Sequence, residues 1–335
     1  MESWKKNHVV SIQQFNRPSL TLLCSIGDSA KVIVDRQGGC EVLKHKVLAN
    51  IFMEPSSRTS SSFAAAMQRL GGTVIQLNES TSSAVKGESL ADTIRTMNCY
   101  TDALVLRHPQ QGSALIASKN SIGRPFLNAG DGVGEHPTQA LLDLYTIVCE
   151  QRRSKATTNG IDGVDGLTIV LIGDLKHGRT VHSLAKLLAM FSVTLVYVNP
   201  PELGMPQEVQ EAVKETSGGR VMQEVYTALD AALLARADVL YVTRVQKERF
   251  ASPEEYERLK LAFIITPEIM KHSKSSAILM HPLPRVGEID DSVDSDPRAA
   301  YFRQMECGLY IRMALLTLLF GCSENLQVVA ATPCR

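Results

Sequence analysis

The stretch Phe52-Met-Glu-Pro-Ser-Ser-Arg-Thr-Ser-Ser-Ser-Phe63 takes the chain from an apolar run into a row of hydroxyl side chains that holds one arginine, Arg58. The apolar run Val47–Met53 predicts a buried strand, and the helical spacing of apolar residues from Phe63 onward predicts a helix. A strand that turns directly into a helix leaves several backbone N–H groups without helical partners. Together with the helix dipole and a guanidinium, these donors suit a bound phosphate. Serine and threonine also cap ordinary helices, so this stretch alone leaves both interpretations open.

Short apolar runs alternate with segments of helical periodicity along the rest of the chain. Strands that are apolar on both faces and separated by helices are typical of parallel sheets with helices on either side. A polar, glycine-rich stretch at residues 152–166 predicts a loop or linker between two such series. The predicted strands are 46–53, 73–77, 103–107, 125–129, 167–173, 193–198, 221–224, 238–242 and 277–280. The predicted helices are 60–70, 89–100, 137–150, 180–190, 206–215, 228–236, 253–262 and a C-terminal helix within 299–322.

We therefore predict an α/β protein with two doubly wound parallel-sheet domains. The expected limits are residues 1–150 for the first domain and 151–298 for the second, with the helix in 299–322 packing back on the first domain. A chain of 335 residues is long for one compact core, which agrees with two domains.

The composition excludes several classes of function. The 35 basic and 35 acidic side chains cancel, which argues against binding to nucleic acid or a membrane through bulk charge. The seven cysteines are scattered, odd in number and without CxxC spacing, so we expect reduced thiols and no zinc site. The N-terminus lacks the apolar core of a signal peptide. We expect a cytoplasmic protein that needs no metal or cofactor and acts on small molecules.

Further polar side chains in the first series follow predicted strands, where doubly wound sheets bind ligands. Arg107 ends one apolar run and could serve as a second cationic donor for a phosphate. His136 ends a glycine-rich turn just before Pro137, a favoured first helical residue. A lone histidine there is commonly a structural cap, but a neutral imidazole could also polarise a carbonyl group. Lys86 lies in a polar loop, which from its residues alone predicts a mobile surface loop.

The second series carries a different set of groups at its strand ends. Arg179 follows one strand, and Arg244 with Gln246 follows another, which favours a ligand with two carboxylates. The turn His281-Pro-Leu-Pro-Arg285 is rigid and could aim backbone carbonyls at an amino group. The stretch 172–182 lacks the G-x-G-x-x-G spacing of a dinucleotide site, so a dehydrogenase is a poor match.

In this order, these segments resemble the aspartate carbamoyltransferase family over nearly the whole chain, from Ser11 to Ala314. The core Ser56-Ser-Arg-Thr59 is similar to the carbamoyl-phosphate signature that this family shares with ornithine carbamoyltransferases. The segment 293–305 resembles the animal and fungal form, in which the enzyme is one domain of a multifunctional polypeptide. The resemblance implies transfer of a carbamoyl group from carbamoyl phosphate to L-aspartate, in pyrimidine biosynthesis.

The resemblance also implies roles for residues that bind carbamoyl phosphate. The residues expected to hold the phosphate are Ser56, Arg58, Thr59 and Arg107. The residues expected at the reacting carbamoyl group are Thr59, Arg107 and His136 at its oxygen and Gln139 at its nitrogen. Two residues, Ser82 and Lys86, match a loop that enters the site of a neighbouring subunit, which implies a homotrimer and reverses the interpretation of this loop from its residues alone.

For aspartate, the resemblance implies that Arg179, Arg244 and Gln246 bind the carboxylates, together with Lys86, and that Pro282 and Leu283 present backbone carbonyls. It further implies an interdomain bridge formed by Glu54, Arg179 and Arg249.

Two alternatives remain besides the dehydrogenase. Ornithine carbamoyltransferases usually carry Cys-Leu-Pro where this chain has Pro282-Leu-Pro284, and they need acidic groups for a cationic substrate. Arg244 therefore favours aspartate. A non-catalytic assembly domain would tolerate loss of the pocket residues, yet each of them is present in this sequence.

Overall fold

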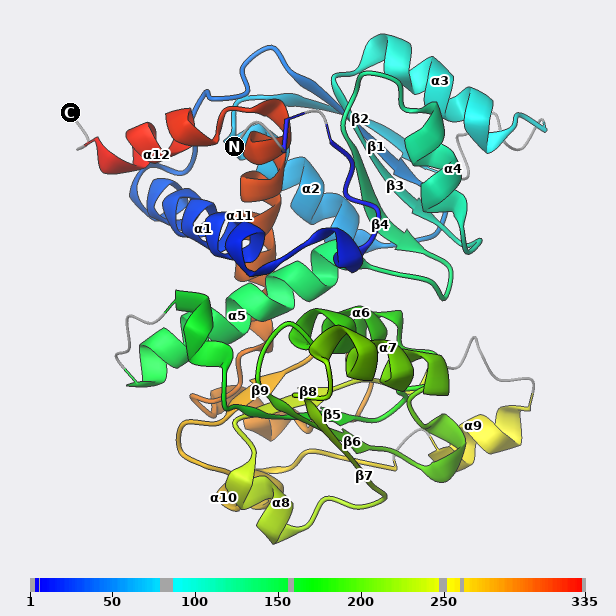
Figure 1. Cartoon of the computed structure of the whole chain (residues 1–335), viewed down its shortest axis with the longest axis vertical. Helices are drawn as coiled ribbons and strands as arrows, with labels where there is room; N and C mark the ends of the chain where they lie inside the picture. The colour runs from blue at the N-terminus through cyan, green and yellow to red at the C-terminus, as the bar shows by residue number, and fades with distance from the viewer. Residues whose placement is uncertain are drawn as a thin grey trace. The chain divides into compact units, whose positions relative to one another are not determined.

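Two compact α/β units make up the structure. The computed structural model describes residues 4–5, 7–78, 87–155, 160–246, 252–259 and 262–332. The first unit comprises Met1–Leu142 and Glu306–Arg335, and the second comprises Asp143–Met305. Each unit is built on one sheet whose described strands pair in parallel, which confirms the predicted fold class (Figure 1). The sequence-based domain limits at residues 150 and 298 differ by a few residues from this division into units, and they stay a prediction.

The sheet of the first unit has the strand order β2-β1-β3-β4. After β1 the chain adds β2 on one side, and it then adds β3 and β4 on the other side. The strand order therefore reverses between β1 and β3, and such a switch point is where ligands bind in open α/β sheets. The four strands are β1 (Val47–Phe52), β2 (Thr73–Asn78), β3 (Ala103–His108) and β4 (Phe126–Asp131).

Helices of the first unit follow its strands, and three of them lie in segments for which the sequence made no helix prediction. Those three are α1 (Arg17–Gln37), α4 (Ser113–Asn120) and α12 (Ser323–Ala331). Asn16 caps the start of α1, and Gly38 ends it with a left-handed φ of 81°, which glycine adopts without steric cost. The helices α2 (Ser57–Arg69) and α3 (Leu90–Tyr100) were predicted within three residues of their observed limits.

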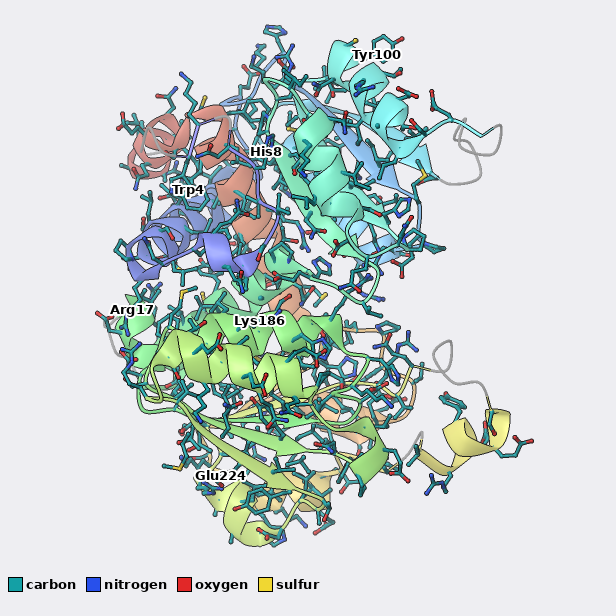
Figure 2. The ribbon with its side chains drawn as sticks, turned by 45° about the vertical axis from the view of Figure 1, so that its right-hand side comes forward. Trp4, His8, Arg17, Tyr100, Lys186 and Glu224 are labelled. Carbon is teal, nitrogen blue, oxygen red and sulfur yellow. The ribbon has the colours of Figure 1, made fainter. Side chains whose placement is uncertain are left out.

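The C-terminal helix and the N-terminal segment both pack within the first unit. In α11 (Tyr301–Phe320), buried Arg312 donates to the Ser62 hydroxyl at 2.9 Å and lies 5.0 Å from the centre of the Phe63 ring. The predicted return of this helix to the first domain is therefore confirmed, for its part from Glu306 onward. The His8 ring packs edge-on against Phe126, and Trp4 and His8 are labelled in Figure 2.

The sheet of the second unit has the strand order β7-β6-β5-β8-β9. The chain adds β6 and β7 on one side of β5 before it adds β8 and β9 on the other, so the switch point lies between β5 and β8. Strand β5 is buried on both faces over most of its length, as the sequence predicted. The strands are β5 (Thr168–Ile172), β6 (Thr194–Val198), β7 (Met222–Tyr226), β8 (Val239–Val242) and β9 (Ile278–Met280).

The helices of the second unit correct one prediction. Helix α5 (Pro137–Lys155) continues past residue 152, and Gly160–Val164 forms a 3-10 helix, so the stretch 152–166 is not wholly a loop. The other helices are α6 (Arg179–Leu188), α7 (Gln207–Ser217), α8 (Ala231–Arg236), α9 (Pro253–Leu259) and the unpredicted α10 (Pro267–Lys271). Over the described ranges, no helix has both the length and the apolar character that a membrane span requires.

Candidate active site

The turn from β1 into α2 has the geometry of an open anion site. Ser56 precedes the helix in an extended conformation, and its hydroxyl makes no capping hydrogen bond to the first turn. The first turn carries no acidic side chain. Thr59 is buried, whereas Arg58 is exposed. Because the Ser56 hydroxyl does not cap the first turn and no acidic side chain lies in it, the geometry is compatible with an anion site at this helix start.

A buried asparagine fixes the start of α2 against the sheet. The Asn50 side chain, fully buried in β1, donates to the carbonyl of Ser60 at 3.1 Å and to its hydroxyl at 3.2 Å. The N–H of Ser60 in turn donates to the carbonyl of Ser56 at 3.2 Å. The helix start is therefore held by the strand that precedes it, so the direction of its N–H groups is set by the sheet.

Arg107 and Glu54 meet at the switch point of the first sheet. The N–H of Met53 donates to the carbonyl of Arg107 at 2.9 Å, and Arg107 Nη2 lies 3.2 Å from Glu54 Oε1. The Arg107 side chain is only 13% exposed. A guanidinium carries five N–H donors, so Arg107 can keep this ion pair and still donate to an anion. Glu54 was expected to bridge to Arg179 and Arg249; Arg249 lies outside the described residues, and that bridge stays a prediction.

Two carboxylates near the proposed anion site belong to the fold. Asp131 accepts the N–H of Glu135 at 2.9 Å and the N–H of Gly112 at 3.1 Å. Glu135 accepts the Ser11 hydroxyl at 2.9 Å and the N–H of Ile12 at 2.8 Å. These bonds engage both oxygens of each carboxylate in shaping the glycine-rich turn and tying down the N-terminal segment.

His136 directly precedes α5, as the sequence predicted. Its carbonyl accepts the N–H of Gln139 at 3.0 Å and of Ala140 at 3.3 Å, which is the pattern of a residue at a helix start. The His136 and Gln139 side chains are 3% and 6% exposed. Since β1, β3 and β4 are neighbours and parallel, Ser56–Thr59, Arg107 and His136 lie in or just after the carboxyl ends of adjacent strands. Ser82 and Lys86, which were expected to complete a neighbouring site, lie outside the described residues.

In the second unit, the loops after β5 and β8 are locked together. A Cβ atom on Gly173, which has a φ of 109°, would lie 2.3 Å from the Thr243 carbonyl oxygen, so the close approach requires glycine. The fully buried Asp174 accepts the N–H of His177 at 3.0 Å and the N–H of Gln246 at 3.3 Å. The Gln246 side chain donates to the carbonyl of His177 at 3.0 Å. One carboxylate therefore ties both ligand loops into a single frame.

This frame positions the two arginines expected to bind aspartate. Arg179 is the first residue of α6, and its N–H donates to the carbonyl of His177 at 3.1 Å. The His182 ring donates to the carbonyl of Leu175 at 2.7 Å, and burial lowers the pKa of this histidine, which favours its neutral form. Arg244 follows the neighbouring strand β8 and is partly exposed. Arg179 and Arg244 therefore belong to segments that follow adjacent parallel strands, and guanidinium groups suit carboxylates.

The turn after β9 contains a buried polar chain that the sequence did not predict. His281 Nδ1 accepts the N–H of Leu283 at 2.8 Å, and Nε2 lies 2.6 Å from Glu288 Oε1. Glu288 Oε2 accepts the N–H of Val286 at 2.9 Å. Burial alone would raise the pKa of Glu288, but the hydrogen bonds from His281 and from the backbone outweigh it and lower that pKa. Pro282 and Leu283 remain partly exposed, as ligand groups must be.

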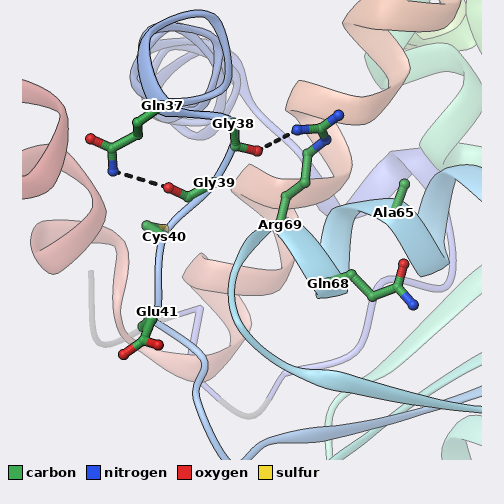
Figure 3. Close-up of a pocket in the computed structure, with 8 residues that line it drawn as sticks. All are labelled: Gln37, Gly38, Gly39, Cys40, Glu41, Ala65, Gln68 and Arg69. Atoms are coloured by element: carbon green, nitrogen blue, oxygen red, sulfur yellow. Dashed lines mark hydrogen bonds between the residues drawn. The ribbon is translucent and has the colours of Figure 1, made fainter.

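The pocket drawn in Figure 3 lies elsewhere in the first unit. It has a volume of about 540 Å³, and Arg69 donates to the carbonyl of Gly38 across its wall. None of the residues predicted to bind a ligand lines it. The lining residues are Gln37, Gly38, Gly39, Cys40, Glu41, Ala65, Gln68 and Arg69. Across the described part of the chain, no three His, Cys, Asp or Glu side chains are grouped so as to hold a metal ion.

Comparison with known proteins identifies the family. Residues 7–149 match the model "Aspartate/ornithine carbamoyltransferase, carbamoyl-P binding domain", and residues 165–319 match the corresponding "Asp/Orn binding domain". The aspartate carbamoyltransferase catalytic subunit of Thermococcus kodakarensis is 44% identical over 319 residues, which cover 95% of this chain and 98% of that protein. This chain belongs to the aspartate and ornithine carbamoyltransferase family.

The chain is also similar to part of a longer protein and to a solved structure. The multifunctional protein pyr1-3 of Dictyostelium discoideum is 53% identical over 314 residues, or 94% of this chain, and the match spans only 13% of that protein. Aspartate transcarbamoylase from Trypanosoma cruzi, solved with N-(phosphonacetyl)-L-aspartic acid, is 44% identical with a TM-score of 0.86. That match covers 94% of this chain and 96% of the Trypanosoma chain.

Proposed function

We propose that this carbamoyltransferase moves the carbamoyl group of carbamoyl phosphate onto the amine of L-aspartate, a step of pyrimidine biosynthesis. The observation that carries the proposal is that Arg179 and Arg244 lie in the segments that follow the adjacent strands β5 and β8, and that Asp174 ties these segments together. Two guanidinium groups suit a dicarboxylate and disfavour ornithine, whose side chain is cationic. The names of the Thermococcus relative and of the Trypanosoma structures, one of which holds carbamoyl phosphate and aspartate, support the same substrates.

In this proposal the first unit binds carbamoyl phosphate. The N-terminus of α2, with Ser56, Arg58, Thr59 and Arg107, holds the phosphate. Thr59, Arg107 and His136 donate to the carbamoyl oxygen. Gln139, which is 6% exposed and lies in the first turn of α5, accepts from the carbamoyl nitrogen.

The second unit binds aspartate through its strand-end groups. Arg179, Arg244 and Gln246 hold the two carboxylates, and the carbonyls of Pro282 and Leu283 accept hydrogen bonds from the amino group. Because the two carbonyls accept from the N–H groups of the amine, they orient its lone pair for attack.

The chemistry requires one bond to form and one to break. The neutral aspartate amine attacks the carbamoyl carbon, so a C–N bond forms and negative charge develops on the carbamoyl oxygen. Removing a single preorganised donor to such an oxygen costs about 3–4 kcal/mol in comparable sites. The C–O bond to phosphate then breaks, and the departing phosphate takes its electron pair and the amine proton. Positioning both substrates can contribute roughly 7–11 kcal/mol.

We further propose a homotrimer in the cytoplasm, with Ser82 and Lys86 of one subunit acting in the site of its neighbour. Strand β2, which leads toward that loop, is an edge strand with Ile75 39% exposed, and an exposed apolar edge suits a subunit contact. The match to short portions of multifunctional proteins supports a natural role as one domain of such a polypeptide. The bridge of Glu54, Arg179 and Arg249 and the limits 1–150, 151–298 and 299–322 belong to the same proposal.

The proposal is tested by incubating the purified protein with carbamoyl phosphate and either L-aspartate or L-ornithine. We expect carbamoyl-aspartate and phosphate in equal amounts, and no detectable citrulline, because the second site is cationic. The measurement is product identification by mass spectrometry together with phosphate release. Carbamoylation of ornithine instead of aspartate would overturn the proposal, and the absence of both products would favour a non-catalytic assembly domain.

A further inference from the structure

We infer that His281, whose ring is held in one tautomer by Glu288 and whose backbone is held by Gln304, is a positioning residue that directs the Pro282 carbonyl toward the amino group of the second substrate. The inference rests on the proposed function, because it assigns a task in aspartate binding. His281 is fully buried and Glu288 is 3% exposed, so neither touches the substrate directly. Both lie in the second unit, as does every other residue of the argument.

The hydrogen bonds assign the tautomer of His281. The backbone N–H of Leu283 can only donate, so Nδ1 of His281, 2.8 Å away, must offer a lone pair. The ring proton then sits on Nε2, which donates to Glu288 Oε1 at 2.6 Å. Glu288 is an acceptor with both oxygens, since Oε2 takes the N–H of Val286. Glu288 therefore keeps the proton on Nε2 and leaves Nδ1 free to accept.

The direction of the Pro282 carbonyl follows from this bond. In the described part of the chain the peptide bond from Pro282 to Leu283 is trans; the cis bond in this turn is the next one, from Leu283 to Pro284. In a trans peptide the N–H and C=O groups point in opposite directions. Because the N–H of Leu283 points into the protein at His281, the Pro282 carbonyl points away from the buried ring. Leu283 holds a φ of 53°, which non-glycine residues rarely adopt, so the turn needs such support.

A second chain of buried groups holds the backbone of His281. The His281 N–H donates to Gln304 Oε1 at 3.0 Å, and Gln304 Nε2 donates to Asp143 Oδ1 at 2.7 Å. Asp143 Oδ2 accepts the Tyr241 hydroxyl at 2.8 Å. The carboxylate can only accept, so it fixes which way the Gln304 amide faces. Each of these side chains is fully buried, so the Gln304 oxygen that accepts the backbone N–H of His281 is in place before any substrate binds.

The test uses two substitutions that each keep one nitrogen position of the imidazole. In His281→Asn the side-chain oxygen can take the place of Nδ1 and accept from Leu283. In His281→Gln the amide takes the place of Nε2, so it can donate to Glu288 but leaves the N–H of Leu283 without its acceptor. We expect His281→Gln to raise KM for aspartate by about 5- to 10-fold, the effect of losing one hydrogen bond between uncharged groups. His281→Asn should restore KM to within about threefold of the wild type.

A second pair of variants keeps the test decisive if the histidine variants fold poorly. In Glu288→Gln the side-chain amide group would face a donor, either His281 Nε2 or the N–H of Val286. One hydrogen bond that supports the turn is then lost, so this variant should reproduce the rise in KM for aspartate. Glu268→Gln, on the exposed end of α10, is the matched control and should leave KM unchanged. The KM for carbamoyl phosphate, measured alongside thermal unfolding, should stay within about twofold in all four variants.

The outcomes separate the two claims. If the wild type forms carbamoyl-aspartate and His281→Gln matches His281→Asn in aspartate KM, the positioning role is wrong. Parallel increases in both substrate KM values would likewise overturn it, because they would indicate a general structural defect. If the wild type forms no carbamoyl-aspartate at all, the proposed function itself fails.

Discussion

The Arg58→Ala variant should lose about 10²- to 10³-fold in kcat while its thermal unfolding midpoint stays close to that of the wild type. Arg58 occupies the second position of α2, where an anion would meet both the helix N-terminus and the guanidinium. The side chain is exposed, and exposed substitutions seldom change stability by more than about 0.5 kcal/mol. The measurement is the steady-state rate of carbamoyl-aspartate formation as a function of the carbamoyl phosphate concentration.

Two control variants make the Arg58 result specific. Arg58→Lys keeps the charge but loses the bidentate geometry, so its activity should fall between those of the wild type and the alanine variant. Arg95→Ala removes an equally cationic side chain, 61% exposed, from the surface of α3 in the same unit, and should leave activity unchanged. An Arg58→Ala protein with full activity would refute the assignment of the phosphate site.

The second large effect is expected for Asp174→Asn. The substitution places an amide N–H where a buried carboxylate oxygen now accepts from the backbone of His177 or Gln246. A buried donor left without an acceptor costs about 1–3 kcal/mol, so the two loops should separate and thermal stability should fall. We expect kcat/KM for aspartate to decrease by about 10²-fold, because displaced arginines lose their alignment with the carboxylates. Steady-state kinetics with aspartate as the varied substrate measures this effect.

The matched control for Asp174 is the cap residue of α8. Asp230 accepts the N–H of Leu233 at 2.7 Å, and asparagine caps helices as well as aspartate does. Asp230→Asn should therefore change neither stability nor kinetics. If Asp174→Asn lowers kcat/KM for carbamoyl phosphate as much as kcat/KM for aspartate, the carboxylate supports the whole fold and does not hold the aspartate loops in particular.

The sequence predicted the strand ends well because apolar runs and the groups that follow them are local signals. Arg107 and His136 were found in this way. In the structure Arg107 lies near the carboxyl end of β3, and His136 lies between β4 and α5. Helix α1 was not predicted, since Gly27 and the β-branched run Val32–Val34 weaken its helical signal. The continuation of α5 to Lys155 was missed because the polar residues there mimic a linker.

The contacts between distant segments could not be predicted from local patterns. Glu54 and Arg107 are 53 positions apart, and their ion pair depends on β1 and β3 being neighbours in the sheet. Gln304 joins His281 from 23 positions away, through a helix start that the sequence located only roughly. Such pairings become visible only when the strand order is known, because polar residues in a sequence do not reveal which partner satisfies them.

The assignment of both substrate sites is tested most directly by a crystal structure of this protein with N-(phosphonacetyl)-L-aspartate, which resembles the two proposed substrates joined in one molecule. We expect its phosphonate to bind at the N-terminus of α2 with Arg58 and Arg107. We expect the two carboxylates of the same molecule to bind Arg179 and Arg244. An analogue bound through other residues, or no bound analogue in crystals grown with a large excess of it, would contradict this assignment.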